Sequence, residues 1–158
     1  MEKELRQHGR FPLTTDVCEQ IRTGRTDVRS LSPQALAFVG DCIFDLVIRT
    51  RIAEDGNRPV RQMHRKKASL VNAGAQARMA ELLKPMFTEE EKDIYRRGRN
   101  CHPSTMAKNQ SVSDYRHATG LEALCGYLYL SGQIGRILEL IDAGLAAMET
   151  KGREDHEG

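Results

Sequence analysis

The sequence predicts an all-α fold built as one domain. Of its 158 residues, 39% are hydrophobic and 29% charged, with five prolines and no tryptophan, a composition typical of a helix-rich globular chain. Two largely apolar segments, residues 33–53 and 114–131, read as helices that would share one core. No repeat of roughly 20 to 50 residues and no low-complexity linker divides the chain, so we expect one compact unit.

The first part of the chain is expected to lead into a buried helix. Residues 1–30 form an N-terminal extension, in which a short helix is indicated at about Asp16–Arg22. A clearer helix begins at Ser32-Pro33, because the serine can cap free backbone amides and the proline fits the first helical turn. This helix should run to about Ala53. Since it is apolar on nearly every side, we expect it to be central and buried.

Two further helices are expected in the middle of the chain. The first spans about residues 59–84 and is stopped by Pro85. The second spans about residues 89–97 and begins with the Thr88–Glu91 spacing of a capping box. Gly98 is expected to end it.

The carboxyl-terminal part is expected to hold a loop, two helices and a tail. Residues 98–113 are rich in turn formers and contain no acidic residue, which indicates an exposed loop. Helices follow at about residues 114–131 and 134–148. Residues 149–158 are expected to be a disordered tail.

The composition and motifs exclude several classes of protein. The amino end is charged and polar, and no stretch approaches the roughly 18 uninterrupted apolar residues of a membrane span, so we expect no membrane partner and a cytoplasmic protein. The four cysteines are widely separated and match neither a zinc site nor a disulfide framework. Motifs for acyl transfer, nucleotide hydrolysis and hydride transfer are missing from the sequence.

Two acidic residues lie in the most apolar helices without a basic neighbour. In a helix, residues three and four positions apart are neighbours. At these positions Asp41 has a second acid, Asp45, and Glu122 has only small or uncharged side chains. Because burying an unpaired carboxylate is costly, each acid must meet a basic group from another helix, stay protonated or bind a metal. Carboxylates among small neighbours suit Mg²⁺, which uses few carboxylates and keeps several waters. A salt bridge between helices or an exposed helix edge is the alternative for either acid.

Asp45 and the basic residues have ordinary explanations when each is taken alone. Arg49 follows Asp45 by four residues, the favourable order for an ion pair on a helix. The formal net charge is only +2, yet basic residues gather in two acid-poor segments. Either cluster alone could be a solvated helix face, but two clusters around a possible metal site favour a polyanion bound through its phosphates. The clusters are Arg58, Arg61, Arg65, Lys66 and Lys67, and Arg96, Arg97, Arg99, Lys108 and Arg116.

Four short segments, in this order and spacing, resemble the ribonuclease III family. ALAFVGDCIFDLVIR, residues 35–49, is similar to the catalytic stretch in which a Gly-Asp pair follows an apolar turn. LEALCGYLYL, residues 121–130, is similar to the later stretch whose glutamate completes the metal site. RRGRN with the Lys108-Asn109 pair, and then YRHATGLEAL, resemble the stand-alone Mini-ribonuclease III subfamily. The similarity covers roughly residues 31–148.

This resemblance implies a ribonuclease III catalytic-domain-like helical bundle over residues 31–148. It also implies an all-helical homodimer. The two active sites of such a dimer would face one RNA duplex, and each would cut one strand and leave a 5′-phosphate end. By position, Asp41 and Glu122 match the catalytic carboxylates that bind Mg²⁺, and Asp45, Lys108 and Asn109 match supporting positions. Precursor large-subunit ribosomal RNA is the implied substrate class, with ribosomal proteins as further candidate partners. The candidate RNA-binding residues are Arg61, Arg65, Lys66, Lys67, Arg97, Arg99 and Arg116.

The sequence also departs from the longer enzymes of that family. Gln34 and Ala37 stand where those have glutamates, and Thr119 stands where they have an aspartate, which leaves fewer direct metal ligands. We expect no double-stranded-RNA-binding domain after Met148, so the catalytic domain itself would hold the RNA. Two other hypotheses stay open: a non-catalytic RNA-binding or ribosome-assembly module on the same fold, and a helical interaction protein whose acids form salt bridges.

Overall fold

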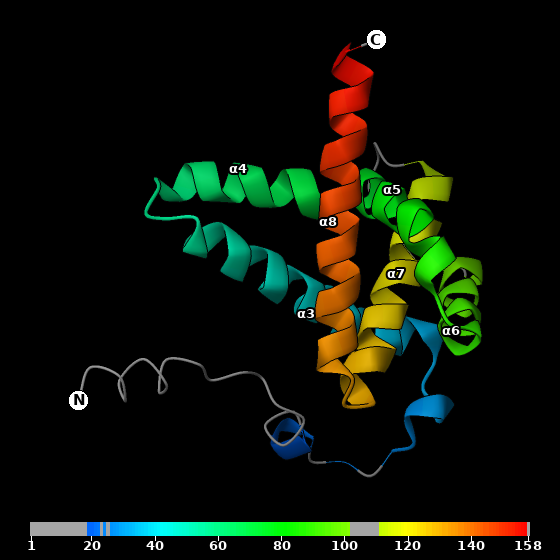
Figure 1. The fold of residues 1–158 in the computed structure, drawn as a ribbon. Coiled ribbons are helices and arrows are strands. Elements are labelled where there is room, and N and C mark those ends of the chain that lie inside the picture. The colour runs from blue at the N-terminus through cyan, green and yellow to red at the C-terminus, as the bar shows by residue number, and fades with distance from the viewer. Residues whose placement is uncertain (1–18, 23, 25, 102–110, 158) are drawn as a thin grey trace.

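The computed structural model of the protein describes residues 19–22, 24, 26–101 and 111–157 (Figure 1). All regular elements in these ranges are helices, as predicted, and none of the helices is long and apolar enough to span a membrane. Of the short helix expected at about residues 16–22, positions 19–21 are helical and the earlier positions lie outside the described residues. In chain order the elements are η1 (Val28–Ser30), α3 (Pro33–Glu54), α4 (Val60–Val71), α5 (Ala73–Leu83), η2 (Lys84–Met86), α6 (Glu89–Asn100), α7 (Val112–Leu130) and α8 (Ile134–Glu157).

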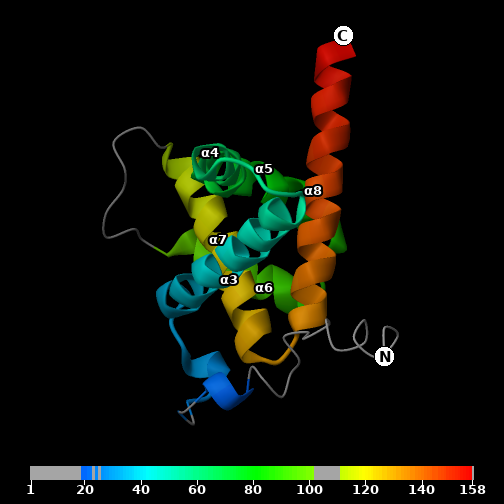
Figure 2. The ribbon, with the colours of Figure 1, turned by 90° about the vertical axis from the view of Figure 1, so that its left-hand side faces the viewer.

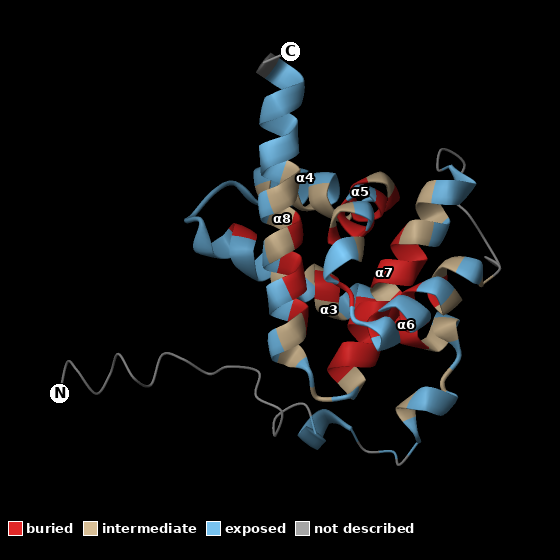
Figure 3. Cartoon of the chain, turned by 45° about the vertical axis from the view of Figure 1, so that its right-hand side comes forward, coloured by how far each residue is buried: buried red, intermediate tan, exposed pale blue. Residues whose placement is uncertain are grey.

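Helix α7 forms the centre of the molecule. Every residue from Ala118 to Tyr129 except Glu122 is buried, and α3, α5 and α6 pack around it (Figure 3). Figure 2 shows α3 crossing in front of α7. The expectation that the two apolar helices share one core is therefore confirmed. The largest fully buried side chains are Leu36, Phe44 and Ile48 of α3, Gln76, Met79 and Leu83 of α5, Leu121, Leu124 and Leu128 of α7, and Ile137 and Ile141 of α8.

Helix α3 is central but is not buried on every side, in contrast to the prediction. Its start agrees with the sequence analysis, since the Ser32 hydroxyl caps the amide of Ala35. However, Phe38 is 83% exposed and Leu46 is 45% exposed. Helix α7 covers one face of α3 and α4 lies along another. The remaining apolar face is left uncovered among the described residues.

The single helix expected over residues 59–84 is two helices, α4 and α5. The break is at Asn72, whose backbone is extended (ψ 158°) and whose side chain accepts a hydrogen bond from the amide of Ala75. Asparagine side chains compete in this way with the helical backbone for hydrogen bonds, which hydrophobic periodicity does not reveal. The break lets α5 turn into the core, while α4, which has no buried residue, lies beside α3 (Figure 1).

Helix α6 begins with the predicted capping box but does not end at Gly98. The Thr88 hydroxyl accepts from the amide of Glu91, and the Glu91 carboxylate accepts from the amide of Thr88. Gly98 lies inside the helix, where an added Cβ would come within 2.7 Å of the Ala123 Cβ on α7. The glycine therefore permits close packing of α6 on α7 and does not terminate the helix.

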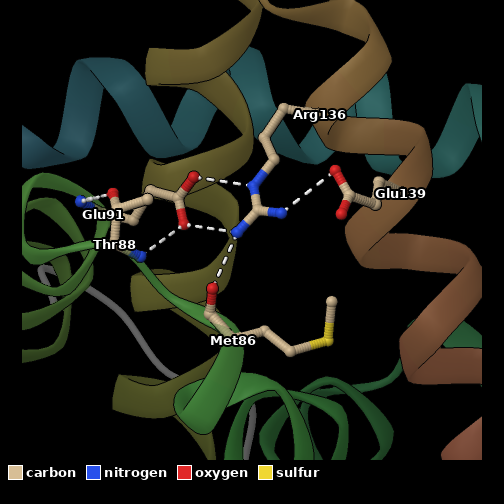
Figure 4. Close-up of polar contacts among 5 residues, drawn as sticks. All are labelled: Met86, Thr88, Glu91, Arg136 and Glu139. Atoms are coloured by element: carbon tan, nitrogen blue, oxygen red, sulfur yellow. Dashed lines mark hydrogen bonds and ion pairs between the residues drawn. The ribbon is translucent and has the colours of Figure 1, made fainter.

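Helix α8 closes the bundle and is held to α6 by an ion pair (Figure 4). Arg136 donates from Nε to one oxygen of Glu91 at 2.8 Å and from Nη2 to the other at 3.0 Å. Nη2 also donates to the carbonyl oxygen of Met86 at 2.7 Å. The partly exposed arginine thus joins α8 to both η2 and the start of α6.

Residues 149–157, expected to belong to a disordered tail, continue α8 instead. Extending a helix that has already formed adds one hydrogen bond per residue without a new nucleation cost, so a polar segment can follow a well-packed helix. Residues 149–156 are exposed, and the end of α8 projects beyond the other helices (Figure 2).

Candidate functional site

Two glycines set the contact between α3 and α7. A Cβ added at Gly40 would overlap the carbonyl oxygen of Glu122, and one added at Gly126 would overlap the carbonyl oxygen of Leu36. The two helix backbones therefore touch with no side chain between them, an approach that requires glycine. Because Asp41 follows Gly40, this contact brings the two acidic positions, far apart in the sequence, to one place.

The side chains of Asp41 and Glu122 interact at this contact. Burial, followed by the charge of the neighbouring Asp41, raises the pKa of Glu122 to about 8. No ion pair to either acid is present in the described part of the chain, and no basic group offsets the charge of Glu122 there. A salt bridge between helices therefore does not account for the pair. Asp41 does lie on an exposed edge of α3, as the alternative allowed.

A third polar group at the site, Gln76 of α5, was not singled out from the sequence. Its side chain is 2% exposed. The amide approaches the Glu122 carboxylate closely enough to oppose the rise of its pKa, yet Nε2 makes no hydrogen bond of regular geometry within the described residues. The available signal was a glutamine inside the otherwise small and apolar run AGAQA, residues 73–77.

The donor set at this contact fits a hard divalent cation. Two carboxylates from different helices lie together without a basic partner among the described residues, and Asp41 is open to solvent. No cluster of three or more His, Cys, Asp or Glu side chains suited to a metal occurs in these residues. The protein would thus provide two carboxylates and water would provide the other ligands, an arrangement that Mg²⁺ commonly adopts.

Positions 34, 37 and 119, where the longer ribonuclease III enzymes have further acidic residues, contribute no carboxylate to this site. Ala37 is buried in the core, and Gln34 is exposed in the first turn of α3. Thr119 is 8% exposed, and its hydroxyl donates to the carbonyl oxygen of Tyr115 at 2.9 Å. The threonine hydroxyl is therefore engaged by its own helix.

Asp45 lies one turn beyond Asp41 but is neutralised by two cations. Arg49 Nε donates to one carboxylate oxygen at 2.5 Å, which confirms the predicted pair on α3. Lys67 Nζ of α4 lies 3.2 Å from the other oxygen. Partial burial opposes ionisation of Asp45, but these two cations outweigh it and lower its pKa. Asp45 thus links α4 to α3 and is not an open ligand like Asp41.

A groove of about 780 Å³ runs along α3 beside Asp41 and Asp45. Asp41, Asp45 and Lys67 line it together with apolar side chains that include the exposed Phe38. Cys42 also lines the groove and is exposed, whereas Cys125 of α7 is buried. The open acid Asp41 therefore shares one groove with the uncovered apolar face of α3.

The candidate RNA-binding and supporting residues differ in their surroundings. Lys66 pairs with Asp55 at 2.8 Å, and Lys67 with Asp45. Lys108 and Asn109 lie outside the described residues. Five others, from α4, α6 and α7, form no ion pair in the described ranges: Arg61, Arg65, Arg97, Arg99 and Arg116. These five have charges available for an anion.

The chain is similar to proteins of one family over most of its length. Residues 34–133 match the model of the ribonuclease III domain. A Mini-ribonuclease 3 of Thermoanaerobacter sp. (strain X514) is 44% identical over 77% of this chain and 86% of the relative, and one of Brevibacillus brevis is 40% identical over 78% and 92%. The fold is also similar to a crystal structure of a protein from Fusobacterium nucleatum, with a TM-score of 0.68 and 31% identity over 74% of this chain and 95% of that one.

Proposed function

The chain belongs to the ribonuclease III family, and we propose that it uses Mg²⁺ to mature precursor large-subunit ribosomal RNA. Its family and its Mini-ribonuclease 3 relatives make it an endoribonuclease specific for double-stranded RNA. The observation that carries the proposal is the meeting of Asp41 and Glu122 at the α3–α7 contact without a basic partner in the described residues.

In this proposal Asp41 and Glu122 hold the cation, directly or through water. When bound, Mg²⁺ supplies Lewis-acid stabilisation of the charge that develops on the scissile phosphate. The glycine contact between α3 and α7 fixes the separation of the two carboxylates before the substrate arrives. Hydrolysis leaves a 5′-phosphate and a 3′-hydroxyl.

Asp45 and the basic residues have supporting roles in this proposal. The Asp45–Lys67 pair holds α4 against α3 beside the groove that contains Asp41. Arg61 and Arg65 of α4, which have no acidic partner among the described residues, would then contact RNA phosphates. Lys108 and Asn109 are further candidates for positioning the substrate. The proposal further includes a cytoplasmic location, with ribosomal proteins as additional candidate partners.

We also propose a homodimer whose two sites face one duplex. Phe38 and Leu46 form part of an apolar face of α3 that no helix covers in the described part of the chain. Large exposed apolar side chains gathered on one face are typical of protein interfaces. A second copy of α3 placed there would bring a second Asp41 near the same duplex.

Incubation of the pure protein with a duplex RNA, with and without Mg²⁺, tests the proposed function. We expect cleavage only with the ion, and we expect Asp41→Asn and Glu122→Gln to abolish cleavage while the helical circular dichroism signal is retained. Asp142→Asn, the same chemical change at an exposed acid of α8, is the matched control and should cut normally.

Full activity in either pure active-site variant would refute the assignment of that residue. Duplex binding without cleavage at any Mg²⁺ concentration would favour the non-catalytic RNA-binding module. Absence of duplex binding even at low salt would favour the interaction protein, because phosphate-driven association is strongest when salt is low.

A further inference from the structure

Gln76 occupies a place in the core where an apolar side chain would pack without penalty. It projects from α5 toward α7, is 2% exposed, and belongs to the fully buried side chains. Its Nε2 is the one buried side-chain nitrogen or oxygen without a hydrogen-bond partner in the described residues. Leaving a buried amide donor unsatisfied lowers the stability of a fold. Packing alone therefore does not explain a glutamine at this position.

The Gln76 side chain interacts with the Glu122 carboxylate of α7. Within the described residues, no basic side chain approaches Glu122, and Gln76 is the uncharged donor that contacts its carboxylate. Thr119 cannot take this role, because its hydroxyl already donates to the Tyr115 carbonyl oxygen. Gln76 is thus the polar side chain of the described structure that can act on Glu122 from the protein interior.

We propose that Gln76 is a positioning residue of the active site, whose amide holds the Glu122 carboxylate in the orientation that binds the metal. A lysine or arginine here would neutralise Glu122 and compete with the cation. A neutral amide can orient the carboxylate and leave its full charge available. The inference rests on the metal-dependent cleavage proposed above, and it names the side chain that supports Glu122 in a site to which the described residues contribute two acids.

Gln76→Leu tests this role, because leucine fills a similar volume without a donor. Hydrogen-bonding partners of metal ligands typically contribute about 10- to 100-fold to metal affinity or activity. We therefore expect weaker Mn²⁺ binding to the protein alone, measured by calorimetry, by about that factor. The Mg²⁺ concentration needed for half-maximal cleavage should rise similarly, while the KM for duplex RNA changes little. The melting temperature should stay the same or increase, because the variant removes an unsatisfied buried donor.

Thr119→Val is the matched control, since it also removes a buried polar atom near Glu122 but one that is already satisfied. It should keep the metal dependence of the wild type. Wild-type Mn²⁺ binding in Gln76→Leu would overturn the proposal, as would a loss of binding that only parallels a lower melting temperature. Failure of the wild type itself to bind Mn²⁺ and cleave would reject the proposed function and this inference together, whereas a normal wild type with a normal Gln76→Leu would reject the inference alone.

Discussion

At the scale of single residues, the glycine at position 40 matters as much to the site as the acid that follows it. Gly40→Ala would place a methyl group on the Glu122 carbonyl oxygen, so α3 and α7 would have to separate. Overpacking of this kind costs about 1 to 3 kcal/mol or more of folding stability. We expect Gly40→Ala to lower the melting temperature and to abolish Mg²⁺-dependent cleavage even where the protein is folded, since Asp41 moves away from Glu122.

Gly135→Ala is the control for this prediction. Nothing lies within 4 Å of a Cβ at that exposed position in the first turns of α8, and alanine is favoured over glycine in helices by roughly 0.5 to 1 kcal/mol. It should therefore be neutral or slightly stabilising, with normal activity. A fully active Gly40→Ala protein would show that the close helix contact is not needed to assemble the acids.

The sequence analysis could find the charged members of the site but not the neutral ones. Asp41 and Glu122 were conspicuous because a carboxylate in an apolar helix needs an explanation. The Asp45–Arg49 pair follows from helical spacing alone. Gln76 was missed because an uncharged residue on a separate helix becomes informative only when its neighbour across the core is known.

At the scale of elements, the ion pair between α6 and α8 is predicted to make a large contribution to stability. Glu91 is 4% exposed, and both of its oxygens accept from Arg136 (Figure 4). Removing one partner of such a pair leaves a buried charge unpaired. Because Arg136 remains partly exposed, we expect Arg136→Met to cost about 2 to 3 kcal/mol at neutral pH, measured by urea denaturation.

This loss should depend on pH in a defined direction. Burial opposes ionisation of Glu91, but the hydrogen bonds from Arg136 and the Thr88 amide outweigh it and lower the pKa below its ordinary value of 4.5. The stabilisation is therefore present above pH 4.5 and disappears as pH falls through the lower folded-state pKa. The difference in unfolding free energy between the wild type and Arg136→Met should therefore shrink as the pH falls into this acidic range. Lys92→Met, which breaks an exposed pair with Glu89, should cost at most about 0.5 kcal/mol at any pH.

Helix α4 is the element predicted to contribute most to RNA affinity beside the active-site groove. It has no buried residue, and Arg61 and Arg65 have no acidic partner in the described structure. Each phosphate contact contributes about one unit to the slope of log affinity against log salt concentration. We expect Arg61→Gln with Arg65→Gln to reduce that slope by about two in a duplex-binding assay, with Mg²⁺ dependence unchanged. Arg153→Gln on the exposed end of α8 is the control, and an unchanged slope in the double variant would remove α4 from the RNA-binding surface.

Element boundaries were predictable where a side chain caps a helix visibly and unpredictable where tertiary packing decides. The starts at Ser32 and Thr88 were read correctly because capping residues act locally. Gly98 was mistaken for a helix end because a glycine that permits a close helix contact has the same local signature as a terminator. Asn72 and the last turns of α8 were missed for related reasons, since periodicity alone cannot show a break or a continuation.

At the scale of the whole molecule, sequence alone predicted one helical core but not the order of its layers. The apolar character of α3 and α7 indicated that the two helices pack together, and they do. The same character suggested that α3 is enclosed, yet one of its faces is open because α4 covers only its neighbouring side. Apolar composition cannot distinguish burial within one chain from burial between two chains. The open face of α3 is therefore the surface through which we expect two chains to associate.

Phe38→Glu tests whether that face joins two copies of the chain. Phe38 is 83% exposed in the single chain and lines the same groove as Asp41. In a two-fold symmetric interface, a glutamate at position 38 of one chain would lie near the same glutamate of the second chain. The two like charges would oppose association. We expect the wild type to sediment as a dimer at micromolar concentration and Phe38→Glu as a monomer with an unchanged helical circular dichroism signal. In the proposed arrangement each site cuts one strand, so the monomer should nick duplex RNA and rarely cut both strands together. Leu138→Glu, on α8 away from this face, should remain dimeric, whereas a monomeric wild type that still cuts both strands together would contradict the paired-site arrangement.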